Sequence, residues 1–329
     1  MTDSAWDRLA PVMDLVTPMA VRVAATLRLA DLLADGPRHV DELAGESGTD
    51  ADALGRLLRH LVCHGVFAEP ATGRFASNDL ADLLRSDHPE RMRDALDLDG
   101  FNGRMDLAFT GLLHTVRTGQ PAWETVFGAP IWDYLAANPE LSATFDAMMA
   151  GSSRAKAVAE YDWSGVRHLA DVGGGSGALL AEVLRANPGI RGTLVDLPDT
   201  VDRGRQLLTE RGLADRCDFV GQSFFEPLPA GADVYVLAGV LHDWADEEAV
   251  AILRRCVDAA GPDGRVLIVE SRSTQAMDAE MDLRMLVFAG GRERDADGFG
   301  ALAKAVGLRV SHVRTIAPGY LFVDCVPGD

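Results

Sequence analysis

Apolar and polar positions change their spacing near residue 165 of the chain. Before that point, apolar side chains recur every three or four positions, which is the spacing of an amphipathic helix, and Gly36 and Pro37 interrupt the pattern. After it, short apolar runs alternate with helical stretches. The apolar runs predict strands at 168–172, 191–196, 217–220, 232–238, 265–270, 308–316 and 320–326.

The second part of the chain is predicted to have an α/β fold. Between the predicted strands lie helical patterns at 177–186, 200–211, 246–260 and 297–306. Short apolar strands that alternate with helices are typical of a doubly wound, mostly parallel, Rossmann-like sheet. We expect the last two strands to form an antiparallel pair at one edge, because only a few residues separate them.

The first part is predicted to be mainly helical. Helical spacing covers 18–33, 39–45 and 50–62, and two short strands around a Pro/Gly turn follow within 66–76. Three helices followed by a small hairpin are the outline of a winged helix. A further helical region runs from about residue 80 to residue 159.

Composition and charge exclude several classes of protein. With 31 Lys and Arg against 50 Asp and Glu, the net charge of −19 disfavours binding to nucleic acid and to anionic membranes. The four cysteines form no metal-binding spacing, so we expect no metal site and reduced thiols in the cytoplasm. The first residues lack the basic start of a signal peptide. No apolar run approaches the roughly 18 residues of a membrane span.

A glycine-rich turn, 171–177, lies between a predicted strand and a predicted helix. Glycines at such a turn let backbone N–H groups approach a ligand closely. Asp196 ends the next strand, where its carboxylate can accept hydrogen bonds from ribose hydroxyls. The pair indicates a nucleoside ligand; the alternative is a tight turn without a ligand.

The turn by itself does not identify the nucleoside. Gly173, Gly175 and Ala178 also satisfy the dinucleotide pattern, which keeps an NAD-linked oxidoreductase open. Two observations favour S-adenosylmethionine. The turn follows about 170 residues of helical chain, and no Tyr-x-x-x-Lys pair suited to hydride transfer follows it.

Three further features are candidates for chemistry. His242 and Asp243 follow a predicted strand at the ligand edge of the sheet, where a neutral imidazole can accept a proton. Glu270 and Glu293 are more often surface or capping acids, but a carboxylate can orient an imidazole. The last feature is an aromatic and a methionine at i and i+4 of a helix, Phe145 and Met149, which are more often core than pocket.

With these motifs in order, the chain resembles the S-adenosylmethionine-dependent small-molecule O-methyltransferases of the caffeic-acid type. It is most similar to the actinobacterial branch that acts on polyketides and other aromatic antibiotic precursors, such as the carminomycin, mitomycin and naphthoic-acid O-methyltransferases. The resemblance covers nearly the whole chain. The segments that carry it are 171–177, 194–198, 223–229, 240–244, 282–286 and 290–294.

The resemblance implies a role for each matching residue. The cofactor S-adenosylmethionine is expected at Asp171, Gly173, Gly174, Gly175, Asp196, Leu197, Ser223 and Phe224. The catalytic group is expected to comprise His242 as general base with Asp243, Glu270 and Glu293. The acceptor is expected to lie against Phe145, Met149 and Met285. Ser223 stands where relatives often have Asp, and Ala238 replaces a common Ser or Lys, which puts two polar cofactor contacts in doubt.

The resemblance also implies an organisation and an activity. It assigns 1–100 to a winged-helix-like dimerisation domain, 101–160 to a helical connector that lines the substrate pocket, and 161–329 to the catalytic domain of a homodimer. The expected reaction is methylation of a phenolic hydroxyl on an aromatic, polyketide-like intermediate. Two alternatives are a winged-helix transcriptional regulator, although residues 20–77 hold six Arg against eight acids, and cofactor-assisted hydroxylation. The sequence does not identify the acceptor.

Overall fold

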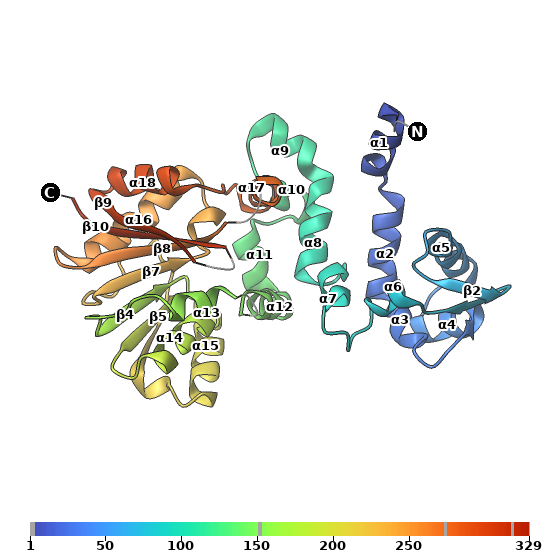
Figure 1. The fold of residues 1–329 in the computed structure, drawn as a ribbon, viewed down its shortest axis with the longest axis horizontal. Helices are drawn as coiled ribbons and strands as arrows, with labels where there is room; N and C mark the ends of the chain where they lie inside the picture. Colours follow the sequence, from blue (N-terminus) through green and yellow to red (C-terminus); the bar gives the residue numbers. More distant parts are fainter. Residues whose placement is uncertain (1–3, 151–152, 273–274, 317–318, 329) are drawn as a thin grey trace. The chain divides into compact units, whose positions relative to one another are not determined.

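The computed structural model describes residues 4–150, 153–272, 275–316 and 319–328. Contacts within the chain divide it into two compact units, and the boundary along the chain falls between Leu107 and Ala108 (Figure 1). The first unit holds the N-terminal helices and a small sheet, and the second holds the remaining helices and a large sheet. Each unit has its own hydrophobic core, so each is described separately.

The first unit is mainly helical. Its helices are α1 (Ala5–Leu9), η1 (Ala10–Met13), α2 (Val16–Thr26), α3 (Leu29–Leu32), α4 (Val40–Ser47), α5 (Ala51–Cys63), α6 (Asp79–Asp82), α7 (Met92–Leu96) and α8 (Phe101–Ala108), the last of which reaches the boundary. Three short strands, β1 (Arg38–His39), β2 (Ala68–Ala71) and β3 (Arg74–Ala76), pair antiparallel in the order β1-β3-β2.

Helix α5 shows how the sequence directs this unit. The Asp50 carboxylate caps its first turn by accepting a hydrogen bond from the Ala53 N–H at 2.8 Å. Leu54, Leu58 and Leu61 recur at helical spacing and are all buried in the core of the unit. Burial of each leucine side chain stabilises the fold by about 2 kcal/mol.

The first unit contains an apolar segment that the sequence analysis missed. Among the described residues, the helical stretch Ala5–Thr26 is the one long and apolar enough to cross a membrane, with a mean hydropathy of 1.3 and 17% of its window buried. The expectation that no apolar stretch approaches the length of a membrane span is therefore wrong for this segment. The sequence analysis counted uninterrupted apolar runs, whereas the mean hydropathy of a helix stays high when only isolated charged residues interrupt the run. Helices in protein cores pass the same test, so it assigns no membrane role.

The second unit begins with helices and continues as a doubly wound sheet. The first helices are η2 (Phe109–Gly111), α9 (Leu112–Thr118), α10 (Trp123–Phe127), α11 (Ile131–Ala137), α12 (Pro139–Ala150) and α13 (Arg154–Ala159). The later helices are α14 (Ala178–Ala186), α15 (Pro198–Glu210), η3 (Ala214–Arg216), η4 (Leu241–Asp243), α16 (Asp246–Ala260), α17 (Gln275–Ala289) and α18 (Ala296–Ala305). Helix α17 was not predicted.

Seven strands form one sheet in the order β6-β5-β4-β7-β8-β10-β9. They are β4 (His168–Val172), β5 (Arg191–Asp196), β6 (Cys217–Gly221), β7 (Val234–Ala238), β8 (Arg265–Ser271), β9 (Leu308–Ile316) and β10 (Tyr320–Pro327). The first five in the order are parallel, and β10 pairs antiparallel with both β8 and β9. The predicted α/β class is confirmed, with its mostly parallel sheet.

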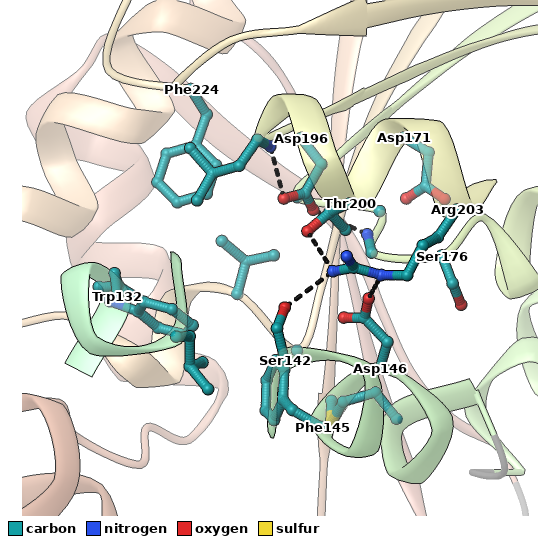
Figure 2. A pocket seen from close by; sticks show the side chains of 18 of the residues that line it. Trp132, Ser142, Phe145, Asp146, Asp171, Ser176, Asp196, Thr200, Arg203 and Phe224 are labelled. Carbon is teal, nitrogen blue, oxygen red and sulfur yellow. Dashed lines mark hydrogen bonds and ion pairs between the residues drawn. The ribbon is translucent and has the colours of Figure 1, made fainter. Parts of the chain in front are cut away.

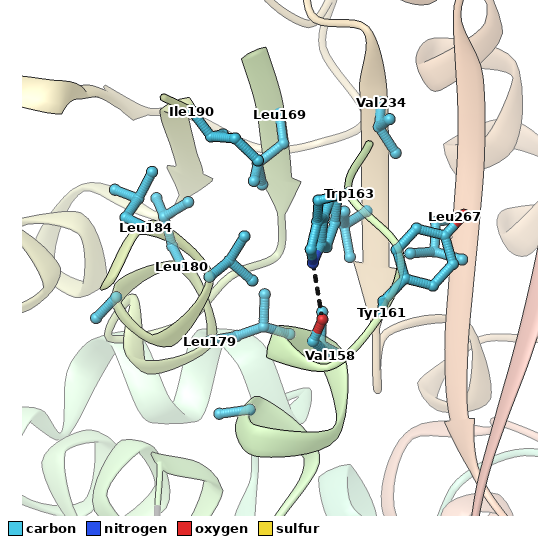
Figure 3. Close-up of a cluster of buried hydrophobic side chains, with 14 of the residues drawn as sticks. Val158, Tyr161, Trp163, Leu169, Leu179, Leu180, Leu184, Ile190, Val234 and Leu267 are labelled. Atoms are coloured by element: carbon cyan, nitrogen blue, oxygen red, sulfur yellow. Dashed lines mark hydrogen bonds between the residues drawn. The ribbon is translucent and has the colours of Figure 1, made fainter. Parts of the chain in front are cut away.

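Two hydrophobic cores cover the two faces of this sheet. Successive strand side chains point to opposite faces, so Leu169 packs in one core while Ala170 packs in the other. The first core includes Trp163, whose indole N–H donates a hydrogen bond to the Val158 carbonyl at 2.9 Å (Figure 3). Packing on both faces fixes the sheet, and so fixes the loops at the carboxyl ends of its strands.

Candidate active site

A cavity of about 470 Å³ lies at the carboxyl ends of β4, β5 and β7. This is the edge where doubly wound sheets bind ligands. The residues that follow these strands, together with the helices α11, α12 and α13, supply its walls. Figure 2 shows Phe224 and Trp132 toward one side of the cavity and a polar group around Arg203 toward the other.

The glycine-rich turn forms the floor of the cavity and requires glycine for two separate reasons. Gly173 has a φ of 69°, a left-handed conformation that other residues rarely adopt. A Cβ on Gly174 would lie 2.6 Å from the Asp171 carboxylate and 2.6 Å from a methyl group of Leu194. A larger residue at either position would therefore strain or displace the turn that lines the cavity.

Asp196 braces this turn from the end of β5. Its two carboxylate oxygens accept hydrogen bonds from the N–H of Gly175 at 2.8 Å and of Leu197 at 2.7 Å. Burial raises the pKa of Asp196 to about 6, because the two N–H donors do not fully offset the loss of water. Burial, and then the charge of Asp196, raise the pKa of Asp171 to about 7. Two carboxyl groups thus sit beside the turn and face the cavity.

His242 lies in η4, directly after β7, and carboxyl groups surround its ring. Its Nδ1 lies 2.8 Å from Oε1 of Glu293, within hydrogen-bond distance, and 3.9 Å from Oε2 of Glu270. On the opposite side, Nε2 lies 3.6 Å from Oδ1 of Asp243. Segments far apart in the sequence thus bring Glu270 and Glu293 to the imidazole, beside its chain neighbour Asp243.

This surrounding changes the proton affinity of His242. Burial lowers the pKa of the ring, but the negative charges of Glu270, Asp243 and Glu293 raise it by more than burial lowers it. The pKa of His242 therefore reaches about 9. Burial raises the pKa of the Asp243 carboxyl to about 6 and also raises that of Glu270. The cluster therefore favours a protonated imidazole held between carboxylates at neutral pH.

A buried arginine that the sequence analysis missed lies between the cavity and this cluster. Arg154 of α13 is 8% exposed, lines the cavity and donates a hydrogen bond to the Ala238 carbonyl at 3.3 Å. Its charge lowers the pKa values of Asp243 and Glu270. Within the described part of the chain, its Nε has no hydrogen-bond partner. A buried, unpaired N–H is costly unless a ligand accepts it.

Aromatic rings form the remaining wall. Trp132 stacks with Trp244 at 6.0 Å between ring centroids, and Trp132 also meets Phe145 edge to face. Trp244 in turn contacts Phe224 at 5.8 Å. All four residues line the cavity, so the wall that they form is flat and apolar.

The structure brings most of the predicted residues to this cavity. Its lining includes Phe145, Met149, Asp171, Gly173, Gly174, Gly175, Asp196, Leu197, Ser223, Phe224 and Asp243. Four predicted residues are not among those that line it: His242, Glu270, Glu293 and Met285, of which Met285 is 4% exposed on α17. The lining residues that the sequence analysis missed include Trp132, Asp146, Arg154 and Arg203. No cluster of metal ligands occurs among the described residues.

Two family models match the chain. The model described as O-methyltransferase domain matches residues 109–309, and the model described as O-methyltransferase dimerisation domain matches residues 12–87. Together they cover both units. The match to the first unit gives it a described role, that of a dimerisation domain.

Similar proteins come mainly from antibiotic producers. The 2,7-dihydroxy-5-methyl-1-naphthoate 7-O-methyltransferase of Streptomyces carzinostaticus is 45% identical over 94% of this chain and 94% of that protein. The aclacinomycin 10-hydroxylase RdmB of Streptomyces purpurascens is 44% identical over 92% of this chain and 84% of that protein. The crystal structure of an O-methyltransferase (NcsB1) from neocarzinostatin biosynthesis, in complex with S-adenosylmethionine and 2-hydroxy-5-methyl naphthoic acid, has a TM-score of 0.91. It is 44% identical and covers 96% of this chain and 98% of that chain.

Proposed function

The chain belongs to the family of S-adenosylmethionine-dependent O-methyltransferases, and we propose that His242 is the general base with which it methylates a phenolic hydroxyl of an aromatic, polyketide-like intermediate. The observation that carries the proposal is one imidazole, surrounded by acids, whose chain neighbour Asp243 lines a cavity with a glycine floor and aromatic walls. Similarity to a naphthoate methyltransferase supports the acceptor class.

The residues of the cavity fit S-adenosylmethionine. The glycine turn with Asp171 and Leu197 would hold the methionine and ribose, Asp196 the ribose hydroxyls, and Ser223 and Phe224 the adenine. The unpaired Nε of Arg154 fits the methionine carboxylate, because a guanidinium pairs well with carboxylate oxygens. When bound, the cofactor supplies a methyl group on a positively charged sulfur.

The aromatic wall would orient the acceptor and exclude water. Trp132, Phe145 and Met149 present flat or flexible apolar surface to the cavity. Exclusion of water favours a reaction in which a positive sulfur and a developing phenolate neutralise each other. Most of the remaining acceleration comes from holding the reacting atoms in line. Met285 stays a proposed acceptor contact, although it is not one of the residues that line the cavity.

His242 is suited to take the phenolic proton. If Glu293 accepts a hydrogen bond from Nδ1–H, Nε2 is left to receive the proton. The pKa of about 9 for the imidazolium is close to the ~10 of a phenol, so proton transfer between them is nearly balanced. Because the base must first be neutral, activity should rise with pH until about 9.

We also propose that the protein is a cytoplasmic homodimer without nucleic-acid or membrane partners. The dimerisation domain supports self-association. Its first helices expose large apolar side chains that a second copy would cover: Trp6, Leu9, Val12, Met13, Leu15 and Val16. The four cysteines are free, as expected in a reducing compartment, and the net charge is −19.

Mass spectrometry of hydroxylated naphthoic acids and anthraquinones incubated with protein and S-adenosylmethionine tests the activity. A product heavier by one CH2 group supports methyl transfer. A product heavier by one oxygen atom would instead support hydroxylation, the activity in the name of one relative. Calorimetry separates the cofactors, because we expect binding of S-adenosylhomocysteine and none of NADH. Tight binding of random DNA at low salt would support the alternative function, that of a winged-helix transcriptional regulator.

A further inference from the structure

An ion pair spans the polar side of the cavity, away from the imidazole. Arg203 of α15 donates a hydrogen bond from Nε to Oδ2 of Asp146 on α12 at 2.6 Å. Its Nη2 donates to Ser142 Oγ at 2.8 Å and to Thr200 Oγ1 at 3.0 Å (Figure 2). All four residues line the cavity, so the pair is part of its wall.

The two helices that this pair joins serve different ends of the proposed reaction. Helix α15 starts at Pro198, two residues after Asp196, whose carboxylate faces the proposed ribose site. Helix α12 carries Phe145 and Met149, which flank Asp146 in sequence and line the cavity where the acceptor is proposed to lie. A contact between α12 and α15 therefore links the place of the cofactor to the place of the acceptor.

The pair is built like a fixed contact rather than a surface ion pair. The Asp146 side chain is 8% exposed and that of Arg203 is 28% exposed. Arg203 binds a carboxylate and two hydroxyls at once, which holds its planar guanidinium in one orientation. A buried carboxylate that loses its partner is strongly unfavourable, so α12 is held in place as long as the pair is intact.

We propose, on the basis of the function above, that Arg203 and Asp146 are a positioning pair that holds α12 in place relative to Asp196 at the proposed ribose site, so that cofactor and acceptor are bound in one arrangement. Neither residue needs to touch the reacting atoms. The pair acts by placing Phe145 and Met149 and by setting the electrostatic surroundings of Asp196.

The charges of the two residues act on Asp196 in opposite directions. Besides burial and the two backbone donors, two side chains act on its carboxyl group: Asp146 from α12 and Arg203 from α15. Asp171 from β4 has its own pKa raised by Asp196. Asp146 raises the pKa of Asp196, and Arg203 lowers it. A purely structural role would not separate the two variants in this way.

The test measures the affinity of S-adenosylhomocysteine against pH and the acceptor KM for Arg203→Gln and Asp146→Asn. Affinity should fall as Asp196 becomes protonated, near pH 6 in the wild type. The pH at the midpoint of this fall should move up in Arg203→Gln and down in Asp146→Asn. The acceptor KM should rise roughly tenfold in both variants, because α12 is displaced. In the double variant the midpoint should return toward the wild-type value while the KM stays high.

Matched controls come from the same helices. Glu140→Gln on α12 and Arg205→Gln on α15 make the same charge changes at exposed positions outside the cavity lining, and should leave both readouts unchanged. If Arg203→Gln does not fold, Arg203→Lys takes its place. It keeps the positive charge, so the midpoint should stay, but it cannot hold Asp146 and Ser142 together, so the KM should rise.

Two results would overturn the proposal. One is a pair of midpoints that do not move or that move in the same direction. The other is an acceptor KM equal to that of the control variants. A wild-type protein that fails to bind S-adenosylhomocysteine would refute the proposed function itself. Normal wild-type binding with variants that behave like the controls would refute only the positioning pair.

Discussion

The two sides of the cavity are built by different means. On the side of the glycine turn, the backbone forms the site: N–H groups of Gly175 and Leu197 bind Asp196, and missing side chains make room. On the side of His242, charged side chains form it, since Glu270 and Glu293 reach the ring from separate segments. The first side is set by shape and the second by charge. Changes in side-chain volume at the turn should therefore act mainly on the first side, and changes in the charge around the imidazole mainly on the second.

The largest effect on cofactor affinity is expected from Gly174→Ala. The added Cβ would lie 2.6 Å from Asp171 and Leu194, neither of which can withdraw from the core. Overpacking of this kind costs roughly 1–3 kcal/mol of folding stability. Because the turn must shift to relieve it, affinity for S-adenosylhomocysteine should also fall, by about a hundredfold by calorimetry, which corresponds to about 2.7 kcal/mol of binding free energy. Gly189→Ala is the control, because a Cβ there meets nothing within 4 Å. Equal affinities of the two variants would contradict the role of shape.

His242→Ala should separate the two sides most clearly. Loss of the base should lower kcat by about 10²–10⁴-fold at pH 9, while affinity for S-adenosylhomocysteine stays within about twofold. Rapid-quench kinetics and calorimetry on the same preparation measure both. A variant that keeps the wild-type kcat with cofactor bound would remove the base from the mechanism.

Glu293→Gln should have a smaller effect with a definite sign. Glu293 raises the pKa of His242, so its neutralisation should lower that pKa and move the midpoint of the pH–rate profile below 9 by about one pH unit. The plateau at high pH should fall only about threefold to tenfold, because the imidazole remains. A midpoint that stays in place or rises would show that Glu293 does not stabilise the imidazolium.

The contrast between shape and charge also explains what the sequence could predict. The glycine turn and Asp196 lie within 26 residues of continuous pattern, 171–196, and local spacing was enough to find them. Short apolar runs that alternate with helical stretches indicated the sheet, which packs on both faces. The residues of the proposed catalytic cluster were noted from their places after predicted strands and before a predicted helix, but only the resemblance grouped them, because the cluster's three segments are brought together by the strand order.

Other features carry no local signal. Helix α17 mixes acids and apolar residues without a clear apolar face, so its spacing did not predict a helix. The place of β10 between β8 and β9 depends on pairing with a distant strand. Arg154 and Arg203 look like surface arginines in the sequence, and only the folded chain shows that one is buried and the other holds Asp146.

The most direct test of the proposed base is the rate of methyl transfer to a series of related phenols of decreasing pKa, measured at pH 8 for the wild type and for His242→Ala. Acidic phenols are already ionised in solution and need no base. We predict that the wild-type protein is faster by about 10²–10⁴-fold with a phenol of pKa ~10 and that this advantage shrinks steadily as the phenol becomes more acidic. An advantage that does not depend on the acidity of the phenol would contradict proton removal by His242.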